Sequence, residues 1–324
     1  MKVSRRPTPS QTHLQTSARD QIWIDGGGFL MGSDQHYPEE APVHPVKVDG
    51  FWIDVAPVTN RQFAEFVEAT GYVTLAEKAS NPEDYPGAPP EMLKPGSVVF
   101  DPPKRVSGSG PPQWWKFRFG ANWRRPYGGL SNLRGKLDHP VVQVAFADAM
   151  AYALWRGKDL PTEAEWEFAA KGGLEGKEFA WGDEFIPDGR FMGNTWHGLF
   201  PTEDLKPDSF ERTSPVGSFP PNGYGLYDMI GNVWEWTSDY WTTRHPAPAE
   251  MSCCIPVNPR AGSAEASRDP GQPDIRIARR VLKGGSHLCA PNYCRRYRPA
   301  ARHAQEENSA TTHIGFRCVR RHYA

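Results

Sequence analysis

Two cysteines lie close together near the C-terminal end of the sequence. Cys289 and Cys294 fall in the run GGSHLCAPNYCRRYR, from Gly284 to Arg298, and arginines follow the second thiol directly. The thiolate is the form of cysteine that binds metal and attacks electrophiles, and neighbouring positive charge lowers the pKa of a thiol from its free value of about 8.5. These two thiols are therefore the first candidates for chemistry.

The segment between the two thiols is not expected to be helical. On a regular helix, residues five apart point roughly 140° away from each other, so the two sulfur atoms would diverge. Pro291 disfavours that helix, because it restricts the backbone of Ala290 and lacks an N–H of its own. An irregular bend would instead allow the two side chains to converge.

A converging pair of thiols is compatible with several kinds of site. Soft sulfur ligands suit Cu(I), zinc or an iron–sulfur centre, and the last two usually take four ligands. The other cysteines are Cys253, Cys254 and Cys318. The adjacent pair could complete a four-thiolate set but lacks the usual spacing between ligands, whereas a two-coordinate Cu(I) site needs no further ligand. From the residues alone, a redox disulfide or two unrelated thiols stay open beside a metal site.

The composition predicts a compact, loop-rich α+β protein. Hydrophobic residues make up 38% of the 324 residues and aromatic residues 12%, including 12 Trp, so the core must be built largely from rings. The 31 Gly and 32 Pro are too many to lie inside helices and strands. Short helices scattered among strands and loops indicate the α+β class rather than alternating βαβ units.

The net charge and the absence of targeting signals limit the cellular compartments and the kinds of partner that we expect. The formal net charge is −1, whereas a general nucleic-acid binder carries a basic excess. The polar stretch from Met1 to Asp20 has no apolar core of a secretory signal, and no run of 18 or more apolar residues spans a membrane. Five cysteines without a disulfide-like framework indicate a reducing compartment. We expect a cytoplasmic monomer that binds neither nucleic acid nor membrane.

Three helices and several strands can be placed from local signals. Strands are predicted over residues 21–24, 29–31 and 46–53. Thr59 caps the first helix, which buries Phe63, Phe66 and Val67 and ends at Gly71. A second helix runs from Asp148 to Trp155, and a third begins with the capping box Thr162–Glu165 and stops at Gly172.

The chain is predicted to form one domain. Residues 1–18 are expected to be a flexible tail, and residues 19–324 a single catalytic domain. Two stretches rich in Pro, Gly and Ser, about 80–112 and 247–273, are predicted to be surface insertions, the first as a lining of a substrate groove.

Several blocks of this sequence resemble the formylglycine-generating enzymes, the sulfatase-modifying factor family, of prokaryotic type. The resemblance runs in order from about Trp23 to Arg320. Its blocks are Gly27–Gly32, Pro57–Asn60, Gly120–Arg124, Asp138–Val141, Leu160–Glu167, Phe219–Tyr227, Gly231–Trp236 and Gly315–Cys318. Most of these blocks mark a fold that proteins of other function share, so they do not establish an activity. The discriminating block is the cysteine-containing run from Gly284 to Arg298.

The resemblance implies a fold of low regular secondary structure, related to C-type lectin-like folds, and a reaction. In the family, O2 oxidises the cysteine of a Cys-x-Pro-x-Arg motif, in an unfolded or nascent sulfatase polypeptide, to Cα-formylglycine. By resemblance, Cys289 and Cys294 hold Cu(I), and the substrate thiolate joins as a third ligand. Ser286 and Trp234 match family positions that line the copper and oxygen pocket, through hydrogen bonding and the shaping of a dry cavity. As alternatives, Trp234 packs in the core and Ser286 is a turn residue.

The resemblance also implies structural calcium. Carried over by motif, a first site would use Asn194, Thr195, Asp208 and Phe210, and a second Asp228, Met229, Gly231 and Val233. Apolar members would contribute backbone carbonyls, which are ordinary ligands of this hard cation. The alternative is that these segments are Asx turns without metal.

The departures from the family pattern bear on compartment. Secretory members have structural disulfides at positions that here are Ala153, Ala170 and Pro299, which leaves Cys318 without that partner. This loss agrees with a cytoplasmic location. Cys253 and Cys254 match no family position.

Three other functions compete with this one. Ergothioneine-pathway sulfoxide synthases share the domain but need a separate His-rich helical domain, and this chain has 10 His without such a cluster. A thiol–disulfide oxidoreductase would require Cys-x-x-Cys at a helix N-terminus. The main alternative is a non-catalytic module that binds a ligand or partner on the same lectin-like fold.

Overall fold

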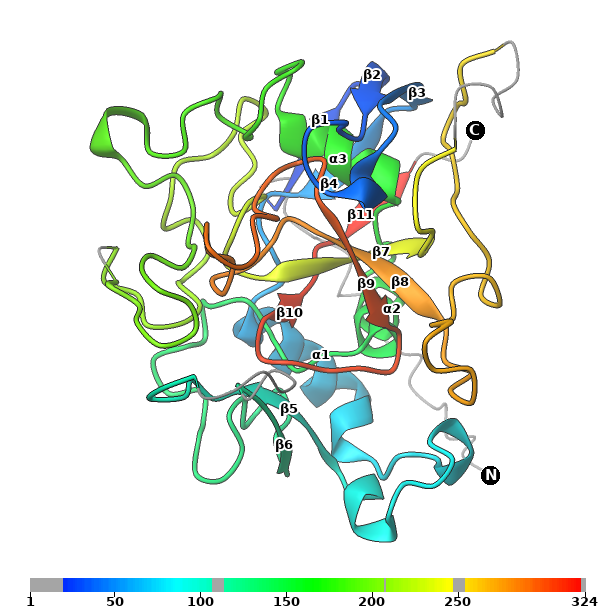
Figure 1. Ribbon diagram of the computed structural model, residues 1–324, viewed down its shortest axis with the longest axis vertical. Coiled ribbons are helices and arrows are strands. Elements are labelled where there is room, and N and C mark those ends of the chain that lie inside the picture. The colour runs from blue at the N-terminus through cyan, green and yellow to red at the C-terminus, as the bar shows by residue number, and fades with distance from the viewer. Residues whose placement is uncertain (1–19, 107–113, 207, 247–253, 322–324) are drawn as a thin grey trace, which may run out of the picture.

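The computed structural model describes residues 20–106, 114–206, 208–246 and 254–321. The predicted tail over residues 1–18 and Cys253 lie outside these ranges, as do parts of both predicted insertions. Within them, no helix is long and apolar enough to cross a membrane. The chain has the predicted α+β architecture, with short helices and small sheets joined by long loops (Figure 1).

A four-stranded sheet forms the centre of the molecule. Its order is β10-β7-β8-β9, and β8 pairs antiparallel with both neighbours while β10 pairs parallel with β7. The strands are β7 (Trp234–Tyr240), β8 (Arg279–Lys283), β9 (Arg302–Glu306) and β10 (Ile314–Gly315). Because side chains alternate along a strand, Trp234 and Trp236 face one side of this sheet and Glu235 faces the other.

Three smaller sheets surround the central one. They are formed by β1 (Gln21–Ile24), β4 (Phe51–Asp54) and β11 (Val319–Arg321), by β2 (Gly27–Met31) and β3 (His44–Val48), and by β5 (Gly96–Phe100) and β6 (Trp115–Phe119). The strands predicted over residues 21–24 and 29–31 are confirmed.

The prediction of one strand over residues 46–53 is wrong. The chain turns at Asp49 and Gly50, so that β3 pairs with β2 whereas β4 pairs with β1 and β11. At Gly50 the backbone lies so close to the Trp23 ring that a Cβ would come within 2.4 Å of it. The alternation of apolar residues continues through the turn at Asp49 and Gly50, so the sequence pattern does not reveal that the strand ends there.

The three predicted helices are confirmed as α1 (Asn60–Thr70), α2 (Phe146–Trp155) and α3 (Glu163–Lys171). Thr59 caps α1 as expected and also forms a capping box with Gln62, Thr162 forms the expected capping box of α3, and Gly71 and Gly172 close the two helices in the left-handed conformation. Helix α2 begins two residues before the predicted start, because the Asp148 carboxylate lies within the first turn and accepts the N–H of Ala145. Short 3-10 helices are η1 (Pro38–Glu40), η2 (Leu75–Glu77), η3 (Pro82–Asp84), η4 (Pro90–Leu93) and η5 (Pro187–Gly189).

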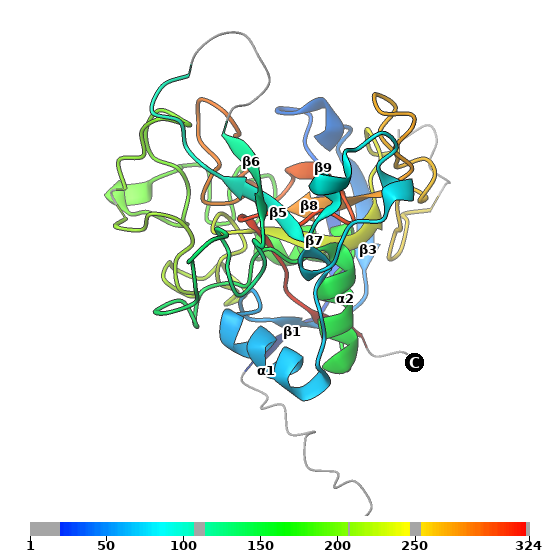
Figure 2. The ribbon, with the colours of Figure 1, turned by 90° about the horizontal axis from the view of Figure 1, so that it is seen from below.

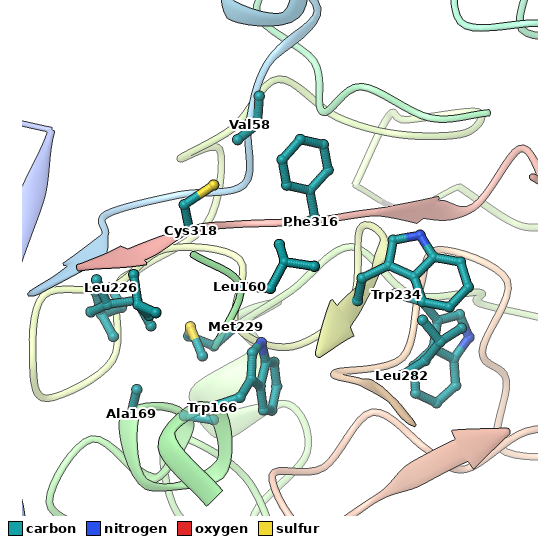
Figure 3. Close-up of a cluster of buried hydrophobic side chains, with 14 of the residues drawn as sticks. Val58, Leu160, Trp166, Ala169, Leu226, Met229, Trp234, Leu282, Phe316 and Cys318 are labelled. Atoms are coloured by element: carbon teal, nitrogen blue, oxygen red, sulfur yellow. The ribbon is translucent and has the colours of Figure 1, made fainter. Parts of the chain in front are cut away.

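Helices cover the two faces of the central sheet. Helix α3 lies on one side together with β2 and β3, and α2 lies on the other (Figures 1 and 2). Trp166 of α3 donates a hydrogen bond to Glu235, whereas Trp236 packs edge-on against Phe146 of α2. Figure 3 shows the core between these elements, where Trp166, Met229 and Leu160 come from separate segments of the chain.

Buried ion pairs tie the long loops to this core. Arg298 binds Glu40 of η1, Lys283 at the end of β8 binds Glu167 of α3, and both basic side chains are almost completely buried. Arg302 pairs in the same way with Glu163, and Arg317 with Glu235. A buried charge that loses its partner is costly, so each pair specifies where a loop must lie.

We expect Glu235→Gln to destabilise the protein by about 3–5 kcal/mol, because Arg317 would stay buried without its counter-charge. Glu235 accepts from both Arg317 and Trp166. The matched control is Asp138→Asn, which removes the exposed ion pair with Arg61 and should cost less than about 1 kcal/mol. Denaturant unfolding of the two variants measures both values. Equal losses would contradict the importance assigned to the buried pair.

Candidate active site

The two thiols lie on an irregular loop that follows β8. Gly284 and Gly285 both have positive φ angles, and a Cβ on Gly284 would lie 2.8 Å from the Met229 carbonyl oxygen. Only glycine fits this close approach. Beyond them, the N–H of Cys289 donates to the Ser286 carbonyl and that of Cys294 to the Ala290 carbonyl. These successive turns, without a helix, bring the two sulfur atoms to 3.1 Å from each other.

The sulfur pair opens into a cavity of about 360 Å³. The predicted residues Cys289, Cys294, Ser286 and Trp234 all line it. Trp234 is therefore both a core residue, only 3% exposed, and part of the cavity wall. Figure 3 shows its side chain close to Leu282, at one end of the buried cluster.

Polar side chains form the wall on the sheet side. His303 and Gln305 of β9 line the cavity, and the His303 ring stacks on Trp234 with centroids 5.6 Å apart. From the β9–β10 connection, His313 adds a third ring that packs on Trp115 of β6. Neither histidine was predicted from the sequence, although the period of two in β9 places residues 303 and 305 on one face.

Aromatic rings form another wall. Phe200 stacks on Tyr293 with centroids 4.1 Å apart, and Trp114 packs edge-on against both rings. Phe200 and Trp114 belong to a second apolar cluster together with Phe100 of β5. Strand β5 lies inside the segment predicted to be an insertion, and its Val98 reaches the cavity. That segment therefore contributes to the cavity wall.

The two thiols differ in their electrostatic surroundings. A hydrogen bond from Cys289 lowers the pKa of Cys294 to about 7, with burial acting against this and Arg296 adding to it. Burial raises the pKa of Cys289 well above its ordinary value, and the shared hydrogen bond with Cys294 adds to this shift. Of the two thiols, Cys294 is therefore the more acidic. The Ser286 N–H lies 3.4 Å from the Cys289 sulfur, and the Ser286 hydroxyl accepts the N–H of Leu288.

The three arginines after Cys294 have separate acidic partners. Arg298 is buried against Glu40 and has a structural role, and the half-exposed Arg295 pairs with Glu178. Arg296 binds Glu39 at 2.6 Å and stacks over the Tyr37 ring, yet it also lines the cavity. The sequence analysis found the cluster but could not assign these partners, because Glu39 and Glu40 lie more than 250 residues away in the chain.

The donor set of the sulfur pair fits Cu(I). Two soft sulfur atoms converge on one cavity, and thiolates suit Cu(I), zinc and iron–sulfur centres, of which Cu(I) is the one that two ligands can satisfy. In the described part of the chain, no cluster of three or more His, Cys, Asp or Glu could hold a metal ion. A four-coordinate zinc or iron–sulfur site therefore finds too few ligands among these residues.

The residues predicted to hold calcium lie on two loops that touch each other. Asn194 accepts the N–H of Asn232, and a Cβ on Gly231 would lie 2.4 Å from the Asn194 carbonyl oxygen. The Asn194 side chain donates to the carbonyl of Arg212, which follows Asp208 and Phe210 in the chain. Thr195 hydrogen-bonds to His197, whose pKa is lowered by burial and raised in part by Asp208.

Each of the two predicted loops has a buried carboxylate oxygen without a hydrogen-bond partner. They are Oδ2 of Asp208 and Oδ1 of Asp228. The other oxygen of Asp208 accepts the N–H of Phe210, and that of Asp228 accepts the N–H of Gly217. Burial raises the pKa of Asp228 to about 6. A buried carboxylate oxygen that accepts no hydrogen bond is suited to binding a cation. The residues present are therefore compatible with calcium. Met229 and Val233 are buried, and their backbone carbonyls are the oxygen atoms that they could offer to a hard cation.

The remaining described cysteines lie outside the cavity. Cys254 is exposed, and Cys318 is fully buried, with burial raising its pKa well above the ordinary value. Ala153 and Ala170, where the resemblance implies disulfides in secretory members, are fully buried in the core.

Comparison with known proteins identifies the family. Residues 6–322 match the family described as Sulfatase-modifying factor enzyme 1-like domain. The formylglycine-generating enzyme of Mycobacterium tuberculosis is 51% identical over 303 residues, 91% of this chain and 96% of that protein. The mouse protein named inactive C-alpha-formylglycine-generating enzyme 2 is 38% identical over 317 residues, which are 95% of this chain and 87% of that protein. The structure of PvdO from Pseudomonas aeruginosa superposes with a TM-score of 0.57 at 25% sequence identity. The superposition covers 92% of this chain and 93% of PvdO.

The chain therefore belongs to the sulfatase-modifying factor family, and its fold is that of formylglycine-generating enzymes. The predicted fold class and family are confirmed. Because a relative described as inactive matches most of the chain, membership alone does not establish catalysis.

The thiol pair leads to a prediction on pH. In the metal-free protein we expect the alkylation of Cys294 by iodoacetamide to rise with pH through a midpoint near 7, because the thiolate is the reacting form. In Cys289→Ala the hydrogen bond that lowers this pKa is lost, so the midpoint should move to higher pH. Mass spectrometry of the modified peptides measures both profiles, with the buried Cys318 as an unreactive internal control. An unmoved midpoint would show that Cys289 does not set the reactivity of Cys294.

Proposed function

We propose that this protein is a copper-dependent oxidase that converts the cysteine of a Cys-x-Pro-x-Arg motif in a sulfatase to Cα-formylglycine. The observation that supports it most is the sulfur pair, 3.1 Å apart at an open cavity, within a family whose members include formylglycine-generating enzymes. The proposed substrate is an unfolded or nascent sulfatase, since its cysteine must reach a cavity wall. We also propose that the protein is a monomer and that it acts in the cytoplasm.

The overall reaction balances with a thiol reductant as co-substrate. O2 accepts four electrons, two from the Cβ–S unit of the substrate and two from the reductant. Loss of two electrons and two protons from that unit gives a thioaldehyde, and water replaces its sulfur, which leaves as hydrogen sulfide. The products are the aldehyde, hydrogen sulfide, one net water and the disulfide formed from the thiol reductant. Copper, when bound by Cys289 and Cys294, supplies the site at which O2 and the substrate sulfur meet.

The residues of this chain have distinct roles in the proposal. Cys289 and Cys294 provide the two sulfur ligands, and the Ser286 N–H fixes the orientation of the Cys289 sulfur. Trp234 closes the cavity on the core side, and the rings of Phe200 and Tyr293 shield it on another side. Apolar walls limit water around the reacting atoms, which protects an oxygen-dependent reaction from side reactions.

The activity is tested with a peptide containing Leu-Cys-Thr-Pro-Ser-Arg. We expect the Cu(I)-loaded protein, with O2 and a thiol reductant, to form an aldehyde that a hydrazine traps and mass spectrometry detects. Cys289→Ala and Cys294→Ala should reduce turnover by at least about a thousandfold, because each removes half of the ligand set. Cys318→Ala, which changes a buried thiol outside the cavity, is the matched control and should remain active.

The competing proposal is a non-catalytic module that binds a ligand or partner. It predicts an unchanged peptide even when copper is bound, and binding that survives Cys289→Ala. An unmodified peptide in the presence of the loaded wild-type protein would therefore favour this module and contradict the oxidase.

We further propose two structural calcium sites, one formed by Asn194, Thr195, Asp208 and Phe210, the other by Asp228, Met229, Gly231 and Val233. The unpartnered carboxylate oxygens of Asp208 and Asp228 support them. Such ions would hold together two long loops, one of which leads into β7 and Trp234.

A ligand that binds only the folded state stabilises it by about 2.7 kcal/mol at a hundredfold excess over Kd. We therefore expect calcium chelation to lower the Tm of the wild type by several degrees. Asp228→Asn should lose much of this calcium-dependent shift, whereas Asp183→Asn, a change at an exposed residue paired with Lys177, should retain it. Differential scanning calorimetry with and without chelator measures the shifts. A full shift in Asp228→Asn would contradict the second site.

A further inference from the structure

One permanently charged side chain faces the cavity. Of the described residues that line it, only Arg296 carries a full charge at neutral pH, and no Asp, Glu or Lys is among them. His303 is exposed by its accessible surface, but desolvation within the cavity lowers its pKa, as it does that of His313, so both rings are neutral at pH 7. The electrostatic potential at the thiols therefore depends strongly on Arg296.

The charge of Arg296 acts across the cavity. After burial, the proximity of Arg296 is the next largest cause of the lowered pKa of His303, and it outweighs the opposing effect of Glu39. Glu39 pairs with the guanidinium but does not line the cavity, whereas Arg296 does. The pair therefore presents its positively charged member to the cavity.

Arg296 is fixed in this place from a distant part of the chain. Glu39 Oε1 accepts from both Nε and Nη2 of its guanidinium, and the Tyr37 ring stacks beneath it at 3.8 Å. The phenol oxygen of Tyr37 also accepts the N–H of Arg295. A side chain restrained on two sides cannot swing away when a cation enters the cavity.

We propose that Arg296 makes the two-thiol site selective for a monovalent over a divalent metal ion. Two thiolates and Cu(I) carry a net charge of −1, which Arg296 neutralises. The same thiolates with a divalent ion are already neutral, so the guanidinium adds an uncompensated positive charge. This role rests on the proposed copper site and explains how a site of two sulfur atoms could exclude zinc, which is also a thiolate metal.

Charge selectivity can be separated from thiol ionisation. Both metals displace the same two protons, so any effect of Arg296 on the thiol pKa values changes both affinities equally. The ratio of the two affinities responds only to the difference of one unit of charge between the ions. At a few ångströms in a medium of effective dielectric constant about 20, that difference corresponds to a change of at least about tenfold.

The test compares Cu(I) and Zn(II) affinities of the full chain by competition with chelators under anaerobic conditions. We expect Arg296→Met to shift the ratio toward Zn(II) by at least about tenfold. Arg296→Gln, which retains an amide donor for Glu39, should shift it in the same direction. Arg296→Lys, which retains the charge, should stay within about threefold of the wild-type ratio. Arg295→Met is the matched control, because this neighbouring arginine does not line the cavity, and its ratio should also be unchanged.

An unchanged ratio in both folded neutral variants, with Cu(I) still bound at the two thiols, would overturn this inference alone. A shift of equal size in Arg295→Met or Arg296→Lys would also overturn it. If the wild type bound no Cu(I) at Cys289 and Cys294, the proposed copper site itself would fail, and the inference with it.

Discussion

Buried ion pairs hold the loop that carries the two cysteines. The loop runs between Lys283 and Arg298, and each of these bases is almost completely buried against an acid of a different segment, Glu167 of α3 and Glu40 of η1. Because a buried charge without its partner is strongly unfavourable, the two ends of the loop have one place where they can lie. The loop can then be irregular between them, which lets Cys289 and Cys294 converge as residues on a helix could not.

The same arrangement separates structural charges from a charge that faces the cavity. Arg298 and Arg295 are directed to Glu40 and Glu178, whereas Arg296 lies between them with Glu39 behind it and the cavity in front. On the sheet side, the alternation of β9 directs His303 and Gln305 to the cavity. The site is therefore assembled from η1, the cysteine loop, β7, β9 and the β5–β6 hairpin, and it exists only when the whole chain is folded.

Local signals predicted the elements that depend on neighbouring residues. The cap at Thr59 and the capping box at Thr162 predicted the starts of α1 and α3, and Pro291 argued against a helix between the thiols. The features that were missed depend on contacts between distant residues. The break between β3 and β4 follows from the approach of Gly50 to Trp23, and the pairing of Arg296 with Glu39 joins residues 257 apart in sequence. His303 and His313 escaped notice because neither belongs to a motif, and only the sheet brings them to the cavity wall.

X-ray absorption spectroscopy of the copper-loaded protein reports directly on which atoms surround the metal. We expect Cu(I) with a coordination shell of sulfur only, from Cys289 and Cys294, and loss of that shell when either residue is replaced by alanine. A shell dominated by nitrogen or oxygen, or a sulfur shell that persists without Cys289, would contradict the proposed copper site.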